Sequence, residues 1–249
     1  MDHRHAPRPL PGAFTAPGRL HSALIGAAES RGPLPGRAPA VQHVGMAPAP
    51  IQFWFDFAST YSYPAAMRIE EAAARLGAPL EWRPFLLGPI FTEQLGIKDS
   101  PFNVFPVRGR YMWRDVERLC EKHGLPWKRP SAFPRNGLLA ARVASLAAGE
   151  PWLPAFVRAV FRANFGDDRD IADPGVVQEI LAAAGQDAPA LLARAASAAA
   201  KDLLRARTAE ASRLGIFGAP DFVVAGELFF GQDRMDDALA WAVRRARGP

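Results

Sequence analysis

The sequence of 249 residues predicts an α/β protein in which a long helical region interrupts a small sheet. Three observations predict this class. Residues 51–87 show a strand pattern, a helix pattern and a second strand pattern, and residues 108–214 have helical periodicity almost throughout. Residues 221–245 then return to two short strands and a closing helix. Because 49% of the residues are hydrophobic, the chain can bury a substantial core.

The first segment predicts a β-α-β unit. Residues 51–57 (IQFWFDF) are an apolar, aromatic run with the length of a buried strand. Several residues that commonly cap helices follow, and residues 65–76 predict a helix that ends at Gly77. Residues 79–87 (PLEWRPFLL) predict the second strand, and the helical crossover makes the two strands parallel.

The remaining elements are predicted from helical periodicity and from the glycines that follow each helix. One helix ends at Gly124, and three or four more come after it, with signals at 138–148, 152–165, 174–184 and 189–214. Two short strands around an Ala-Gly turn lie within 221–230, and residues 233–245 form the last helix. This order of elements is typical of a thioredoxin-like fold with an inserted all-helical domain.

The order also predicts the domain organisation. We assign residues 51–100 and 215–249 to the thioredoxin-like domain and residues 101–214 to the helical insertion. Residues 1–50 contain nine prolines and six glycines, and they predict a disordered extension. This extension is interpreted as a disordered tail, a transit-like segment or sequence upstream of a start at Met46, and the last is favoured.

Composition excludes several classes of function. The single cysteine, Cys120, excludes a disulfide scaffold, a zinc ribbon and a dithiol redox enzyme.

Residues 1–50 hold five arginines and two acidic residues, which leaves 25 basic and 23 acidic residues in 51–249. This balance predicts no nucleic-acid partner and no membrane surface. Four of the five histidines also precede residue 51, so no metal site is expected. The chain has no transmembrane-length or secretory apolar run, and cytoplasmic residence is expected.

The turn after the first strand carries the first candidate chemistry. Its residues 59–62 are Ser-Thr-Tyr-Ser, at the place where a thioredoxin-like redox enzyme has two cysteines. If the site uses a thiolate, the sulfur must therefore arrive on a cosubstrate, and the hydroxyl of Ser59 could donate a hydrogen bond to it. On spacing alone, ordinary helix capping by Ser59, Thr60 or Ser62 is the preferred interpretation.

Four motifs resemble one known family. They are the runs DFASTYSY at 56–63, FPVRGRY at 105–111, GAP at 218–220 and FGQDRM at 230–235. In this order they are similar to the 2-hydroxychromene-2-carboxylate isomerase family, which is grouped with kappa-class glutathione transferases and with the DsbA-like thioredoxin fold. The resemblance extends from about residue 51 to residue 242 and does not include residues 1–45.

The resemblance implies a binding site for glutathione. Ser59 matches the first serine of the family's Ser-Pro-Tyr-Ser turn, where the hydroxyl interacts with the glutathione sulfur, although Thr60 stands where proline is usual. Pro220 matches a cis-proline, which leaves the backbone of Ala219 as a partner for the cysteinyl moiety. Without the resemblance, an ordinary trans turn would be expected at this proline.

Four further residues are implied as ligand contacts. Gln232 and Asp233 match the family's site for the γ-glutamyl end, although Asp233 is also a good cap for the last helix. Arg108 matches a cation that could pair with the glycyl carboxylate of glutathione or with the substrate carboxylate, and Asn103 is a plausible amide partner. Asn136, in a segment that also resembles the family, is interpreted as a helix cap in preference to a substrate contact.

Other conspicuous residues are interpreted as structural. Cys120 lies on the apolar face of its helix, so a buried thiol is favoured over a nucleophile. His123 closes the same helix and is expected to serve its terminal carbonyls. Six aromatic residues are assigned mostly to the core, with some expected to line an aromatic pocket: Trp54, Phe57, Tyr61, Tyr63, Trp82 and Phe85.

The resemblance implies an enzyme that uses glutathione as a catalyst. The expected reaction is cis-trans isomerisation of 2-hydroxychromene-2-carboxylate or a related aromatic compound by reversible thiolate addition. A kappa-like transferase that conjugates an electrophile and a non-catalytic module that binds glutathione are the alternatives. A disulfide oxidoreductase is disfavoured because Ser59 and Ser62 occupy the positions that need sulfur. The resemblance also suggests a homodimer.

Overall fold

The structure, a computed structural model, describes residues 47–245. The predicted extension therefore lies, apart from its last four residues, outside the described residues. These described residues form a single unit by their contacts. Within the described part of the chain, no helix is both long and apolar enough to cross a membrane.

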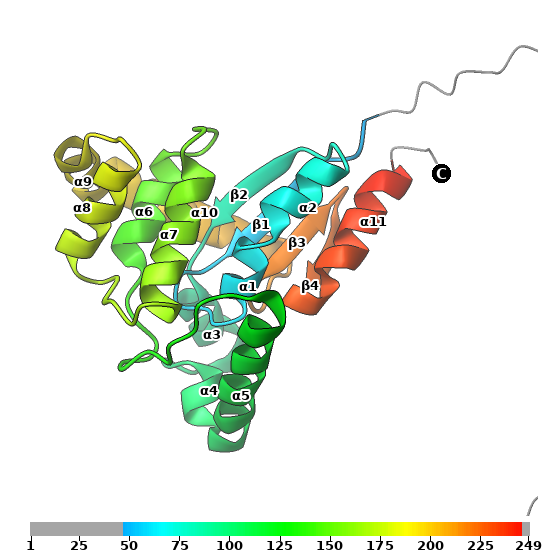
Figure 1. The fold of residues 1–249 in the computed structure, drawn as a ribbon, viewed down its shortest axis with the longest axis horizontal. Coiled ribbons are helices and arrows are strands. Elements are labelled where there is room, and N and C mark those ends of the chain that lie inside the picture. Colours follow the sequence, from blue (N-terminus) through cyan, green and yellow to red (C-terminus); the bar gives the residue numbers. More distant parts are fainter. Residues whose placement is uncertain (1–46, 246–249) are drawn as a thin grey trace, which may run out of the picture. The chain divides into compact units, whose positions relative to one another are not determined.

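A four-stranded sheet forms the centre of the fold (Figure 1). Its strands are β1 (Ile51–Phe55), β2 (Leu80–Pro84), β3 (Asp221–Val224) and β4 (Glu227–Phe230), in the spatial order β2-β1-β3-β4. β1 and β2 are parallel, whereas β3 is antiparallel to both β1 and β4. The predicted β-α-β unit and the predicted hairpin are both confirmed. Ala225 and Gly226 turn the hairpin, and both have positive φ angles, as a two-residue loop of this kind requires.

Two helices join β1 to β2, where the sequence predicts one. They are α1 (Ser62–Ala66) and α2 (Ile69–Arg75). The single helix expected over 65–76 is wrong because the chain tightens at Arg68, whose N–H bonds to the carbonyl of Ala65 three residues back. The last helix, α11 (Met235–Arg245), follows a short 3₁₀ turn, η1 (Gln232–Arg234), and packs beside α2 on one face of the sheet (Figure 1).

The region between β2 and β3 contains helices and loops but no strand among the described residues, which confirms the thioredoxin fold with a helical insertion. Its helices are α3 (Leu87–Leu95), α4 (Pro101–Val104), α5 (Pro106–His123), α6 (Leu138–Leu146), α7 (Leu153–Phe165), α8 (Pro174–Ala183), α9 (Ala188–Ala196) and α10 (Ala198–Arg213). α3 and α4 were not predicted. The helix expected over 189–214 is two helices, because Ser197 is extended and its hydroxyl accepts the N–H of Ala200, which starts α10. The limits 101–214 for the insertion stay a prediction.

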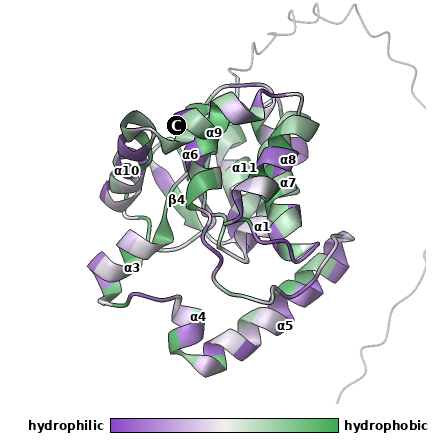
Figure 2. Ribbon diagram, turned by 90° about the vertical axis from the view of Figure 1, so that its left-hand side faces the viewer, coloured by the Kyte–Doolittle hydropathy of each residue, from purple (hydrophilic) through white to green (hydrophobic). Residues whose placement is uncertain are grey.

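Side chains of β1 alternate between two apolar clusters. Phe53 and Phe55 face the larger cluster, in which Phe53 stacks on Phe222 with ring centroids 5.5 Å apart. Trp54 faces the smaller cluster, on the other side of the sheet, with residues from α3 and α10. Figure 2 shows α3, α4 and α5 set apart from α6 to α9, and the candidate site uses the space next to these three helices.

Candidate functional site

A cavity of about 520 Å³ lies between the turn after β1, helices α3 to α5 and the loop before β3. Ser59, Arg108 and Ala219, three of the predicted site residues, line it. Seven of the other twenty lining residues are aromatic: Tyr61, Phe91, Phe102, Phe105, Phe133, Phe217 and Phe230. A depression of similar size between α2 and α11 contains none of the predicted residues, so its size alone does not identify a site.

Ser59 is held at this cavity by two hydrogen bonds. Its hydroxyl donates to the carbonyl oxygen of Ala219 (3.0 Å) and accepts the N–H of Ser62 (3.3 Å). Only 8% of the residue is exposed. The hydroxyl therefore caps α1, as the spacing predicts, and also reaches the loop before β3, which lies 160 residues away in the sequence.

Asp56 shapes the turn that presents Ser59. One carboxylate oxygen accepts the N–H of Ala58 (2.8 Å) and the other accepts the N–H of Leu87 at the start of α3 (2.7 Å). Burial raises the pKa of Asp56, and the two backbone hydrogen bonds act in the opposite direction. The carboxyl ties the turn to α3. Sequence reasoning quoted Asp56 only as part of a motif and did not give it this role.

The next two residues bind the turn to α5. The hydroxyl of Thr60 donates to the sulfur of Met112 (2.9 Å), and the hydroxyl of Tyr61 donates to the carboxylate of Asp115 (3.0 Å). Burial, with a further contribution from Asp115, raises the pKa of Tyr61. Thr60 thus supplies a side-chain contact at the position where the family has proline.

The loop before β3 forms the opposite wall. The bond between Ala219 and Pro220 is cis, as the resemblance implies. A Cβ at Gly218 would meet the ring of Phe230, so a larger residue at this position has to displace that ring. The rings of Phe217 and Phe230 pack with centroids 4.5 Å apart, and both rings line the cavity.

Gln232 and Asp233 lie outside the cavity, within η1 directly after β4. The side-chain oxygen of Gln232 accepts a hydrogen bond from the guanidinium of Arg68 (3.5 Å). The carboxylate of Asp233 is exposed and lies 3.8 Å from the guanidinium of Arg234. η1 contacts α1, the helix that begins three residues after Ser59, but the structure does not bring these two residues to the cavity.

The two residues predicted on α4 and α5 differ in placement. The guanidinium of Arg108 stacks over the ring of Phe105, 5.0 Å from its centroid, and lines the cavity. The side-chain amide of Asn103 donates to the carboxylate of Asp99 (3.1 Å) and to the carbonyl of Phe133 (3.0 Å). Asn103 therefore connects two parts of the wall and does not line the cavity. Lys98, a second cation that lines it, was missed by sequence reasoning.

Arg135 anchors the wall formed by Phe133 and Pro134. Its buried guanidinium donates to the backbone and side-chain oxygens of Asn164 (3.2 Å each) and pairs with the carboxylate of Asp168. Asn164 in turn donates to the carbonyl of Phe57 in the turn after β1 (3.0 Å). The helical region and the turn that presents Ser59 are therefore connected by hydrogen bonds. Arg135 was passed over because nothing in its local sequence indicates partners about thirty residues away.

Cys120 and Asn136 agree with their structural interpretation, whereas the role expected of His123 at the helix carbonyls stays a prediction. Cys120 is fully buried, and burial raises its pKa to about 12. Burial is also the main cause of the lowered pKa of His123. The side chain of Asn136 accepts the N–H of Leu138 (2.9 Å) at the start of α6, as expected of a cap. Among residues 47–245, no three metal-ligating side chains converge.

The chain was compared with known proteins. A model of the DSBA-like thioredoxin domain family matches residues 50–240. Over 186 residues the chain is 31% identical to 2-hydroxychromene-2-carboxylate isomerase of Sphingobium xenophagum, which covers 75% of this chain and 94% of that protein. It is 24% identical over 215 residues to glutathione S-transferase kappa 2 of Caenorhabditis elegans, with coverages of 80% and 94%. A solved structure of 2-hydroxychromene-2-carboxylate isomerase has a TM-score of 0.70 at 24% identity and covers 79% of this chain and 96% of its own. The chain therefore belongs to the DSBA-like thioredoxin domain family, in the group that contains the 2-hydroxychromene-2-carboxylate isomerases and the kappa-class glutathione transferases.

Proposed function

We propose that the chain binds glutathione and uses its thiol to isomerise 2-hydroxychromene-2-carboxylate or a related aromatic compound. The observation that carries this proposal is the hydroxyl of Ser59, which is held at an aromatic cavity where no cysteine of the chain lies. A hydroxyl in this position can donate a hydrogen bond to a thiolate. Because no cysteine lies at the cavity, a thiolate that reacts there comes with a cosubstrate.

Glutathione binding exchanges one hydrogen bond for two. In the structure the hydroxyl of Ser59 donates to the carbonyl of Ala219. When the hydroxyl turns to the incoming thiolate, that carbonyl becomes available for the cysteinyl N–H of glutathione. The bound peptide then pairs with the backbone of Ala219 as an added strand would, next to Pro220. No buried acceptor loses its partner in this exchange.

The ends of glutathione have separate partners in this arrangement. Gln232 and Asp233 take the γ-glutamyl end, because η1 lies against α1 on one side of Ser59. Arg108, on the cavity side, takes either the glycyl carboxylate or the carboxylate of the aromatic substrate. The aromatic lining holds a flat ring above the sulfur.

The reaction needs no net consumption of glutathione. The thiolate adds to the unsaturated carbon of the open form of the substrate, and the electron pair moves to the conjugated carbonyl. The former double bond is then a single bond that can rotate. Return of the electron pair expels the thiolate and forms the double bond in the other geometry. Ser59 stabilises the thiolate at the beginning and at the end of the cycle.

Calorimetry with glutathione tests the binding site. Wild-type protein is expected to bind, and Asp233→Ala is expected to bind more weakly because a carboxylate that pairs with the α-amino group is lost. A protein that does not bind glutathione at millimolar concentration would contradict the proposal.

Ser59 and Ser62 provide a matched pair for testing the thiolate. Both serines are in the same turn, but the hydroxyl of Ser62 has no hydrogen-bond partner among the described residues. The ultraviolet absorbance of the thiolate reports the pKa of bound glutathione. Ser59→Ala is expected to raise that pKa by about 1–2 units, the equivalent of one charge-assisted hydrogen bond. Ser62→Ala is expected to leave it unchanged, and equal pKa values in the two variants would refute the role of Ser59.

Product analysis separates isomerisation from conjugation. The kappa-class relative makes a transferase the second candidate. An isomerase leaves the amount of free glutathione constant over many turnovers, whereas a transferase consumes one molecule for each product. Chromene carboxylates and simple electrophiles are therefore assayed with free glutathione counted before and after.

A further inference from the structure

The first residue of β3, Asp221, is a buried carboxylic acid without a polar partner. None of its surface is exposed, and neither oxygen has a hydrogen-bond partner among the described residues. In the sheet it lies between Trp54 of β1 and Phe230 of β4. The next residue, Phe222, packs into the larger apolar cluster, so the alternation of the strand directs Asp221 to the smaller one.

Charged groups do not neutralise Asp221. Those on the elements that contribute to the smaller cluster include Asp56 after β1, Glu81 and Arg83 on β2, Glu93 on α3, and Arg207 and Glu210 on α10. Glu227 of β4 alternates to the other face of the sheet, because its neighbour Leu228 packs against this cluster. Arg83 pairs with Glu81. Burial is the cause that raises the pKa of Asp221 to about 8. The carboxyl is therefore neutral at pH 7, and it loses its proton under mildly alkaline conditions.

The segment that holds Asp221 also forms the thiol site. Two residues earlier, the carbonyl of Ala219 accepts the hydroxyl of Ser59. The carbonyl of Pro220 accepts the N–H of Gly231, which joins the same segment to the end of β4. An ionised carboxylate at Asp221 needs water, and water reaches it only if this segment moves away from its neighbours.

We propose that Asp221 is a positioning residue for the thiol site: its neutral form keeps Ala219 in place for the ligand, and its ionised form displaces Ala219 and weakens binding. This inference rests on the proposed binding of glutathione. It concerns a residue that lies outside the cavity and acts through the backbone of Ala219.

Calorimetry with S-methylglutathione tests the inference, because this probe has no thiol that titrates. Between about pH 7 and pH 9, wild-type affinity is expected to fall about tenfold more than that of Asp221→Asn, since only the neutral fraction binds. The variant has no proton to lose at this position, and titration of the probe itself affects both proteins equally. Asp202→Asn, which removes an exposed carboxylate on α10, is the control and is expected to behave as wild type. The same pH dependence in wild type and Asp221→Asn would overturn the inference.

A second measurement keeps the two proposals separate. If wild-type protein fails to bind the probe at about pH 6.5, the proposed function fails, and hydrogen exchange of residues 216–224 then decides the role of Asp221. At each pH the exchange rate of wild type is divided by the exchange rate of Asp221→Asn. This ratio is expected to increase several-fold from about pH 6.5 to pH 9. A constant ratio would overturn the inference. If Asp221→Asn does not fold, Asp221→Thr, which has a similar volume and no charge, takes its place with the same criteria.

Discussion

Replacing Asp221 with asparagine is expected to stabilise the protein increasingly as the pH rises. Burial raises the pKa of the carboxyl from 3.8 to about 8 in the folded chain. Between these values the folded chain binds one proton more than the unfolded chain, so the free energy of unfolding falls by about 1.4 kcal/mol for each pH unit. The contribution of the protonated Asp221 carboxyl to the free energy of unfolding is complete below about pH 4 and is lost as the pH rises through about 8. From about pH 5 to pH 7 the wild type therefore loses about 2.7 kcal/mol that the variant does not lose.

Urea unfolding at pH 5, 6 and 7 measures this difference. Tryptophan fluorescence follows the transition, and the free energy of unfolding of the variant minus that of wild type isolates Asp221. His123, whose pKa is lowered in the folded chain, changes stability in the opposite direction near pH 6, but it is present in both proteins and cancels. A difference that stays constant from pH 5 to pH 7 would refute the assignment of a neutral buried carboxyl. This result does not depend on whether glutathione binds.

Four other substitutions or measurements test the remaining structure. Arg135→Ala is expected to lower the free energy of unfolding by about 1–3 kcal/mol in urea, because the buried oxygens of Asn164 lose the donor that the guanidinium supplies; an unchanged free energy of unfolding would contradict the network. Gly218→Ala is expected to cost about 1–3 kcal/mol, seen as a lower Tm, because the new methyl group displaces Phe230. Tyr61→Phe is expected to cost about 1 kcal/mol by the same assay. Cys120 is expected to resist thiol reagents until the protein unfolds, and rapid labelling of native protein would show that the thiol is accessible.

Elements with large apolar residues could be predicted from the sequence. The strand at 51–57 was identified because the aromatic residues of β1 are buried on both faces of the sheet, which produces a continuous apolar run. α3 was missed because Gly88 and Pro89 indicate a turn when read locally. In the structure this proline is in the first turn of α3, where a backbone N–H has no helical partner in any case. The break at Ser197 was missed because alanines on both sides favour a continuous helix.

The candidate site was predictable where its motifs resemble the family. Ser59, Ala219 and Arg108 line the cavity, and each was assigned from such a motif, whereas local spacing alone favoured helix capping at Ser59 and an ordinary turn at Pro220. Asn103 and Arg135 could not be placed in this way, because their partners are about thirty residues away in the sequence. An acidic residue at the beginning of a strand, such as Asp221, usually suggests an exposed end. Only the pairing of β3 with two neighbouring strands shows that the carboxyl is enclosed.

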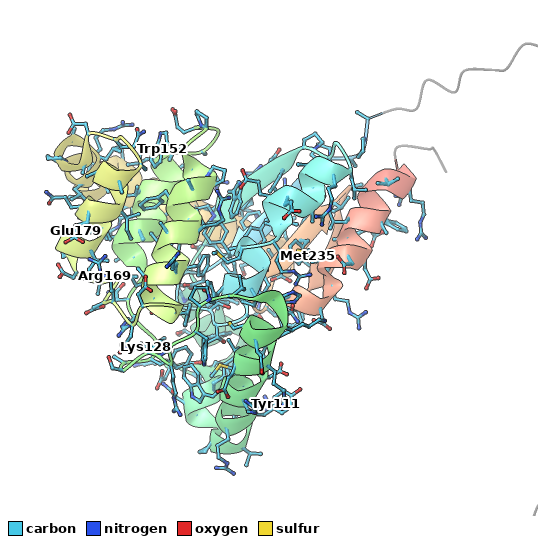
Figure 3. The ribbon with its side chains drawn as sticks, viewed as in Figure 1. Tyr111, Lys128, Trp152, Arg169, Glu179 and Met235 are labelled. Carbon is cyan, nitrogen blue, oxygen red and sulfur yellow. The ribbon has the colours of Figure 1, made fainter. Side chains whose placement is uncertain are left out.

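The hydrogen bond from Asn164 to the carbonyl of Phe57 limits how the helices can be exchanged between relatives. In Figure 3, Lys128 lies in the loop that follows α5 and Arg169 lies in the loop that follows α7. Tyr111 projects outward from α5, with 62% of its surface exposed. A graft of the helices from another family member must retain an amide at Asn164 and a guanidinium at Arg135. Without them the donor to Phe57 is lost, and the turn that presents Ser59 loses a support that its own sequence cannot replace.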